Sequence, residues 1–215
     1  QIDLLKLFHG GFSTGHGFLR EPNSIRAYAS LACIAIQSNQ NDMFGGQSIN
    51  CFDYAMAEGV GKSFRKAVVD EARKALIYRF EADEFLTEQP FKTDFKALVD
   101  FANCRYAESM ETERAKQGIQ AIGDALTKLL EQHEKPTRDA YVDAAAIYRL
   151  ACADVEEETH QAMEALIHNF NTLHSRAGAQ VPFSSINDGV DTAPEGRLAT
   201  RETLNAIWAG LGNGE

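Results

Sequence analysis

One long periodic segment, from Arg138 to about His174, constrains the fold of this chain more than any other feature. Apolar residues recur in it at three- and four-residue spacing, while the acidic residues between positions 154 and 158 lie mostly on the opposite face. This pattern predicts an amphipathic helix that is held in place by the burial of one stripe. At a rise of about 1.5 Å per residue the helix would be about 50 Å long, so we expect it to pack along a large domain.

A second helix is predicted to begin at residues 22–24, with Ser24 as its N-cap. Residues 25–36 are apolar on nearly every face, which is typical of a helix that is buried inside an assembly. Gly45 and Gly46 are expected to end this helix, because glycine accepts the positive φ of a helix terminus.

Most of the remaining chain also has a helical pattern. The predicted segments are Asp53–Glu58, Lys62 to about Glu88, one or two helices within Asp94–Gln132, and a last helix that ends at Ala209. Gly59 and Gly61 are expected to break the first of these, and Pro90 to close the second. Thr137, in a hinge, and Thr192 are the candidate caps of the helices that follow them.

Two segments have the pattern of strands. The first is the QIDLL run at the N-terminus. The second is Gln180–Asn187, which alternates apolar and polar residues as a strand with one solvated face would. Pro182 confines it to a sheet edge, a strand start or a bulge. Long helix, strand and helix in succession predict a helix-dominated α/β fold.

The charge balance limits the possible partners. With 31 acidic against 21 basic residues the net charge is -10, which disfavours nonspecific attraction to nucleic acid or anionic lipid. No apolar run approaches the roughly 18 residues of a membrane span, and no secretory signal is present. We therefore expect a cytoplasmic protein without nucleic acid or membrane partners. The chain starts at Gln1 without Met and stops after Gly-Asn-Gly-Glu, so we interpret residues 1–215 as a single segment of a longer polypeptide.

The cysteines and histidines do not predict a metal site. Cys33, Cys51, Cys104 and Cys152 are widely spaced and form no CxxC pair, so we expect reduced and mostly buried thiols. The histidines show no HxxxH pair, and those within the long helix are expected on its surface.

Two polar segments contain the candidate binding residues. Gln37–Ser48 and Asn171–Asp188 carry clustered polar side chains with too few apolar residues to be explained as core. We interpret them as the lining of a binding site. The alternative, a glycine C-cap in one segment and an ordinary edge strand in the other, remains open.

Four runs of sequence carry a resemblance to a known family. They are QIDLLKLFHGGFSTGHGFLREPNSIRAY, IAIQSNQNDMFGGQSINCFDYAMAEGV, IHNFNTLHSRAGAQVPFSSINDGVDTAPEGR and the terminal AGLGNGE. Taken in this order, they resemble the catalytic subunit of anaerobic, class III ribonucleoside-triphosphate reductase. The likeness extends from the first residue to the last.

The resemblance implies a glycyl-radical enzyme built on a ten-stranded α/β barrel, of which this chain would be the N-terminal part. Such an enzyme reduces ribonucleoside triphosphates to deoxyribonucleotides. A radical-SAM activase places a radical on a glycine near the C-terminus, and a cysteine inside the barrel takes it up and abstracts hydrogen from the ribose 3′ carbon. The resemblance further implies a homodimer, bound zinc and formate as the usual reductant.

By the same resemblance, the catalytic cysteines, the zinc-binding cysteines and the radical glycine all lie outside Gln1–Glu215. None of the four cysteines present stands in a catalytic motif of the family. We therefore expect no catalytic or metal-binding residue in this segment. Alone it should be inactive, and its contribution should be to binding.

The resemblance also supplies a ligand for the polar segments. A triphosphate in an acidic protein must be held by backbone amides, helix N-termini and a few cations. We expect the two segments to converge on this substrate. The residues predicted to contact it are Gly45, Gly46, Gln47, Ser48, Asn171, His174, Ser175, Gln180, Ser184 and Ser185. For His174, capping of the negative end of the helix dipole is the alternative.

An allosteric site is implied at the homodimer interface, beside the helix that begins near residue 24. An ATP or deoxynucleotide effector would bind there and select the substrate. The candidate contacts are Glu21, Asn23 and Gln37, and a capped, buried interface helix is the alternative interpretation.

Two other classes of function remain open. A helical scaffold or partner-binding module would explain the acidic helices but not the polar segments. Another member of the glycyl-radical superfamily, such as a formate-lyase-like acyltransferase, would share the barrel but would lack the NTLHSRAGAQVPF run.

Overall fold

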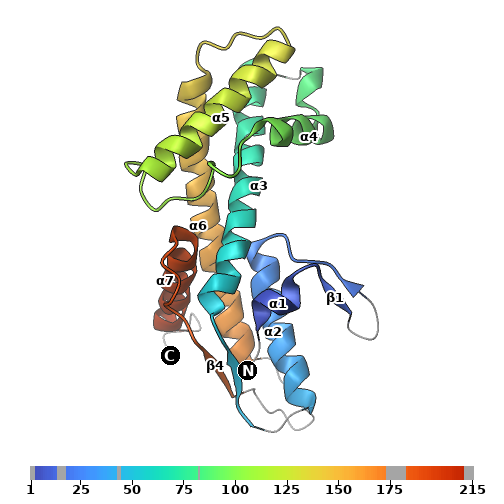
Figure 1. Cartoon of the computed structure of the whole chain (residues 1–215), viewed down its shortest axis with the longest axis vertical. Helices are drawn as coiled ribbons and strands as arrows, with labels where there is room; N and C mark the ends of the chain where they lie inside the picture. Colours follow the sequence, from blue (N-terminus) through green and yellow to red (C-terminus); the bar gives the residue numbers. More distant parts are fainter. Residues whose placement is uncertain (1–2, 14–17, 43–44, 82, 173–182, 211–215) are drawn as a thin grey trace. The chain divides into compact units, whose positions relative to one another are not determined.

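The computed structural model describes residues 3–13, 18–42, 45–81, 83–172 and 183–210, and helices dominate it (Figure 1). The helix-dominated composition is therefore confirmed. The chain divides into two compact units, which we call unit 1 (residues 1–63 and 156–215) and unit 2 (residues 64–155). Strands within the described ranges form two sheets of two strands each. The ten-stranded barrel, and the assignment of the chain to one segment of it, stay predictions.

Unit 1 contains the strands and the predicted site residues. Its elements are α1 (Leu4–Phe8), β1 (Phe12–Ser13), β2 (Phe18–Leu19), α2 (Ile25–Asp42), β3 (Gln47–Ile49), β4 (Ser184–Ile186), α7 (Pro194–Ala209), the start of α3 (Phe52–Phe80) and the end of α6 (Ala140–Thr172). Strand β1 pairs antiparallel with β2, and β3 pairs parallel with β4. The buried core of this unit includes Ile25, Tyr28, Ile36, Phe52, Met56, Met163, Leu166 and Leu198.

The regular elements of unit 2, among its described residues, are all helical. It contains the rest of α3 and α6 together with a 3-10 turn, η1 (Glu84–Leu86), and the helices α4 (Glu88–Leu98) and α5 (Glu113–Gln132). Its core includes an aromatic cluster in which Phe64 of α3 contacts Tyr106 and Tyr148 edge-on, with ring centroids 6.2 and 5.5 Å apart. Aromatic pairs favour this arrangement because the positive edge of one ring meets the negative face of the other.

The long periodic segment forms α6, a helix of 33 residues, and confirms the prediction to within two residues at each end. The predicted apolar stripe is buried, and the buried residues include Tyr148, Cys152, Val155, Ala162, Leu166 and Phe170. The periodicity alone predicted this helix correctly, because a long apolar stripe marks a single face that must be buried against the core.

Helix α2 also begins where predicted. The Ser24 hydroxyl accepts a hydrogen bond from the Ala27 amide at 3.3 Å, which is the expected N-cap contact. The helix ends at Asp42, and Gly45 follows with a φ of 106°. Ile34 is 50% exposed, so within this single chain α2 is not buried on every face.

Helix α3 corrects the prediction of a break at Gly59 and Gly61. One helix of 29 residues passes through both glycines. A Cβ at Gly59 would lie 3.0 Å from the Tyr28 ring and 3.1 Å from the Ile25 Cα. Glycine therefore allows α3 to pass close to α2 at this point, and the packing outweighs the low helix propensity of glycine.

Pro90 was predicted to close a helix, and this is wrong. Helix α3 ends at Phe80, followed by Glu81 at a φ of 52°. Pro90 is instead the third residue of α4. In the first turn of a helix the backbone N–H has no intrahelical acceptor, so proline removes no hydrogen bond there.

Three predictions at chain ends and caps need correction. The QIDLL run was predicted to be a strand, but Leu4–Phe8 is the helix α1, whose N-cap Asp3 accepts a hydrogen bond from the Lys6 amide at 3.2 Å. Thr137 is not the cap of α6, which begins at Ala140. The N-cap of α7 is Ala193 rather than Thr192, with no side-chain bond, because Pro194 occupies the first helical position. The predicted end of α7 is confirmed.

Candidate functional site

Two segments far apart in the sequence, both predicted to contact a ligand, lie side by side in unit 1. Strand β4 runs beside β3, which leads into α3 (Figure 1). The Gln47 amide donates to the Phe183 carbonyl at 2.7 Å. The paired residues are Gln47 with Ser184, Ser48 with Ser185, and Ile49 with Ile186. We call these two strands the ribbon.

The two faces of the ribbon carry different sets of side chains. Alternate residues of a strand point to opposite faces, and paired residues share a face. Ile49, fully buried, and Ile186, half-buried, share one face with the buried Gln47 and the exposed Ser184, a predicted contact. Ser48 is half-buried and Ser185 exposed on the other face. That second face therefore presents two hydroxyl groups that can donate to and accept from a ligand.

The turn before the ribbon is exposed to solvent, whereas Gln47, also a predicted contact, is bonded within the protein. Gly45 and Gly46 are both exposed. At Gly45 the φ of 106° favours glycine over any residue with a side chain. The Gln47 side chain is buried, and its carbonyl oxygen accepts a hydrogen bond from the Asn39 amide of α2. Gln47 thus ties the ribbon to α2.

Asn171, at the end of α6, is exposed and donates to the Ile167 carbonyl at 2.8 Å. Its side-chain carbonyl oxygen accepts no hydrogen bond from the residues that the structure describes. His174, Ser175 and Gln180 lie outside the described residues, so their contribution to the site stays a prediction.

The sequence reasoning missed two acidic residues beside the ribbon, Asp53 and Asp188. Asp53 is in the first turn of α3 and is fully buried. Asp188 follows β4, and its carboxylate accepts from the Thr200 hydroxyl at 2.8 Å. Burial, and to a smaller extent the charge of Asp53, raises the pKa of Asp188. Acidic residues are common in the first turn of a helix, where they interact favourably with the helix dipole. The sequence therefore contained no sign that Asp53 has another role.

The proposed effector contact Glu21 is part of an ion-pair cluster centred on Lys62. The Lys62 ammonium contacts the carboxylates of Glu21 and Glu58, the latter at 3.3 Å, and donates to the Tyr28 hydroxyl at 2.9 Å. The second Glu21 oxygen accepts from the Gly10 amide at 2.9 Å. The hydrogen bond from Lys62 lowers the pKa of Glu21. These contacts favour a structural role for Glu21.

The other two proposed effector contacts are less engaged. Asn23 is exposed. Gln37, on α2, has a buried amide nitrogen that finds no hydrogen-bond partner among the described residues. A buried donor without an acceptor costs about 1–3 kcal/mol, so Gln37 has the stronger physical reason to bind a ligand.

The four cysteines all lie among the described residues. All four are free thiols, and Cys33, Cys104 and Cys152 are buried as predicted. Burial raises the pKa of Cys33 to about 11 and that of Cys104 to about 12. Zinc binds thiolates, so these protonated thiols are poor ligands. No cluster of three or more His, Cys, Asp or Glu side chains suited to a metal occurs within the described ranges.

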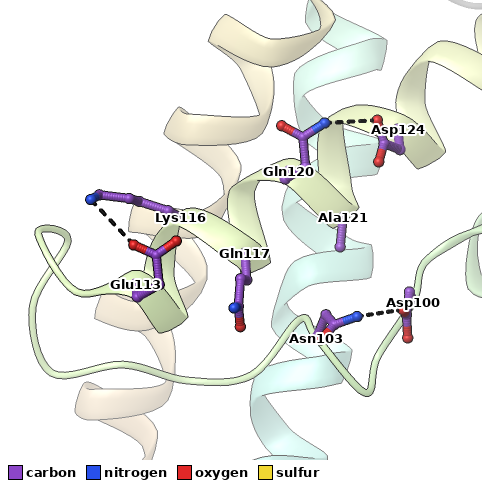
Figure 2. Close-up of a pocket in the computed structure, with 8 residues that line it drawn as sticks. All are labelled: Asp100, Asn103, Glu113, Lys116, Gln117, Gln120, Ala121 and Asp124. Atoms are coloured by element: carbon purple, nitrogen blue, oxygen red, sulfur yellow. Dashed lines mark hydrogen bonds and ion pairs between the residues drawn. The ribbon is translucent and has the colours of Figure 1, made fainter.

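Unit 2 carries an open hollow of about 460 Å³ between α5 and the loop that precedes it (Figure 2). Its lining is polar: Asp100, Asn103, Glu113, Lys116, Gln117, Gln120, Ala121 and Asp124. Many of these groups are already bonded to each other. Asp100 accepts from Asn103 at 2.7 Å, and Gln120 donates to Asp124 at 3.1 Å. None of the predicted site residues lines the hollow, so we keep the ribbon as the candidate site.

Comparison with known proteins identifies one family. Over residues 1–215 the sequence matches the family model described as anaerobic ribonucleoside-triphosphate reductase. No individual curated protein matches it significantly. A helix able to cross a bilayer is absent from the part of the chain that the structure describes.

Proposed function

Because the chain belongs to the anaerobic ribonucleoside-triphosphate reductase family, we propose that it forms part of the surface that binds the ribonucleotide substrate in such an enzyme. The reaction of the family is the anaerobic reduction of ribonucleotides, an oxidoreductase activity. Family membership favours this function over the helical scaffold and over the acyltransferase-like alternative.

The parallel pairing of β3 with β4 is the observation that supports the proposal. It places Ser48 and Ser185 on one face and brings the open turn at Gly45 and Gly46 to the same ribbon. Hydroxyl groups can bond to ribose or base, and backbone amides at a glycine turn suit phosphate oxygens. In the described part of this surface the donors are neutral, which fits a protein whose net charge is -10.

The radical chemistry is proposed for other parts of the intact enzyme. Burial disfavours the thiolates that zinc binds, and by the family resemblance none of the four cysteines stands in a catalytic motif, so we assign no step to them. A glycyl radical, its radical-SAM activase, zinc and a homodimeric assembly are proposed from the family resemblance alone.

Substitution of the ribbon hydroxyls tests substrate binding. We expect Ser48→Ala and Ser185→Ala, in the full-length reductase, each to weaken binding of a ribonucleoside triphosphate about 3–10-fold, the loss of one hydrogen bond. Binding is measured by calorimetry on the enzyme before radical activation, so that no turnover occurs. Thr93→Ala is the matched control, since Thr93 is an exposed helical residue of unit 2 whose hydroxyl donates to the Gln89 carbonyl of its own helix. Wild-type affinity in both serine variants would contradict the proposal.

We further propose that an effector nucleotide binds beside α2 through Asn23 and Gln37. The buried amide nitrogen of Gln37, which has no hydrogen-bond partner among the described residues, supports this second site. Titration of dATP or dTTP into the dimeric enzyme should show about tenfold weaker binding for Gln37→Ala, with a smaller loss for Asn23→Ala. Unchanged effector affinity in both variants would remove the idea.

A further inference from the structure

Asp53 is a buried carboxylate that the proposed function does not yet use. Its side chain is fully excluded from solvent. One carboxylate oxygen accepts from the amides of Val190 and Asp191, both at 2.6 Å, and the other accepts from the Tyr54 amide at 3.0 Å. A buried carboxylate is costly unless it is well bonded, and these three donors supply that compensation.

The bonds of Asp53 continue directly into the ribbon. The Phe52 amide donates to the Asn187 carbonyl at 3.0 Å, and the Asn187 amide donates to the Ile49 carbonyl at 3.0 Å. The first turn of α3 therefore holds the chain that leaves β4 at two places, at Asn187 and at residues 190–191. Since β3 leads into the same turn, both strands of the ribbon are held by one element.

The backbone between β3 and α3 is strained. Cys51 has a φ of 51°, in the left-handed region that residues with a side chain seldom occupy. Such a conformation is energetically unfavourable and persists only where the surroundings enforce it. The bonds around Asp53 provide that enforcement. Strain of this kind is concentrated at ligand sites, which gives the arrangement a reason beyond stability.

We propose that Asp53 is a positioning residue, which holds β4 in register with β3 so that Ser48 and Ser185 face the nucleotide together. It does not itself touch the substrate. This inference rests on the proposed substrate-binding function of the ribbon, and it adds the group that sets the geometry of that surface.

Asp53→Asn in the full-length reductase tests the inference. An asparagine keeps the size of the side chain but turns one acceptor into a donor that opposes the backbone amides. We expect binding of a ribonucleoside triphosphate to weaken about tenfold, with effector affinity unchanged. In the activated enzyme KM should rise while kcat changes little.

Glu71→Gln is the matched control for stability. Glu71 is also a buried carboxylate of α3, but it lies in unit 2 and pairs with Lys74 of its own helix. The Glu71→Gln substitution should lower the melting temperature without changing nucleotide affinity. Equal affinity losses in both variants would mean that Asp53 acts only through stability, and the inference would fail.

The outcomes separate this inference from the proposed function. If the serine variants weaken binding and Asp53→Asn does not, the inference fails and the function stands. If the serine variants bind the nucleotide normally, the proposed function is wrong, and the inference that rests on it is wrong as well. Should Asp53→Asn not fold, hydrogen exchange of the wild-type enzyme decides: substrate should slow exchange at the Val190 and Asp191 amides, and unchanged exchange overturns the inference.

Discussion

Gly118 and Gly123, both on α5, show how one missing side chain affects packing differently at two sites. A Cβ at Gly118 would overlap the ring of Tyr148, and a Cβ at Gly123 would overlap the ring of Tyr141. Tyr148 is fully buried, and its hydroxyl donates to the Arg105 carbonyl at 2.7 Å. Tyr141 is 46% exposed. Only the second ring borders solvent, where its hydroxyl donates to the Asp124 carboxylate at 2.5 Å.

The two glycines therefore predict different responses to alanine. Gly118→Ala should destabilise the protein by about 1–3 kcal/mol, because an overpacked buried ring cannot move. Gly123→Ala should be close to neutral, because displacement of an exposed ring is offset by the better helix propensity of alanine, worth up to about 1 kcal/mol. Urea titration of both variants measures the free energy of unfolding. Equal losses would show that the tyrosines are equally constrained.

At the scale of elements, α7 is held against α6 by an ionisable contact. His160 of α6 lies with Nδ1 3.0 Å from the Glu202 carboxylate of α7 and with Nε2 3.4 Å from Glu164 of its own helix. Arg201 also contacts Glu202, at 2.8 Å. The hydrogen bond with Glu202, assisted by the nearby carboxylates of Glu157 and Glu164, raises the pKa of His160 above 6.5.

This contact predicts a pH dependence of stability. Because the pKa of His160 is raised on folding, its contribution is fully present below pH 6.5 and is lost as the pH rises through the folded-state value. His160→Gln should remove a stabilisation of about 0.5 kcal/mol at pH 6 and almost none well above the folded-state value, the modest size expected for a partly exposed pair. Unfolding free energies at pH 6 and 8 measure the difference. His168→Gln, exposed on the same helix, should leave the pH dependence unchanged; a wild-type pH profile in His160→Gln would contradict the assignment.

At the scale of the whole molecule, two helices continue from one unit into the other. Helix α3 passes from Ser63 in unit 1 to Phe64 in unit 2, and α6 passes from Val155 in unit 2 to Glu156 in unit 1. Because hydrogen bonding along a helix is cooperative, we expect the units to unfold together.

Calorimetry checks this cooperativity. The 215-residue chain should show one transition, with equal calorimetric and van't Hoff enthalpies. Arg65→Pro, at an exposed position of α3 just past the boundary, should cost about 3 kcal/mol and make the calorimetric enthalpy exceed the van't Hoff value. Arg65→Ala is the control and should keep a single transition. Two resolved transitions in the unaltered chain would contradict the prediction.

The sequence by itself determined the elements whose signals are local. The apolar stripe of α6, the Ser24 cap of α2 and the end of α7 were all predicted correctly, because each depends on neighbours within a few residues. The prediction was wrong where a distant contact overrides the local preference, as at Gly59, where the approach of Tyr28 lets a helix continue. It was also wrong at Pro90, which was expected to close a helix but lies in the first turn of α4, where a proline removes no hydrogen bond.

The candidate site divides in the same way. Clustered polar residues marked both Gly45–Ser48 and Ser184–Ser185 in the sequence, but only tertiary structure decided that these segments pair in parallel and turn Ser48 and Ser185 to one face. The role of Asp53 was not visible at all, since two of its three donors, the Val190 and Asp191 amides, lie 137 and 138 positions away along the chain. Caps and amphipathic stripes depend on residues that are close in sequence, so the sequence alone predicts them. Strand pairing and the compensation of a buried charge depend on which distant backbone groups the packed helices bring together.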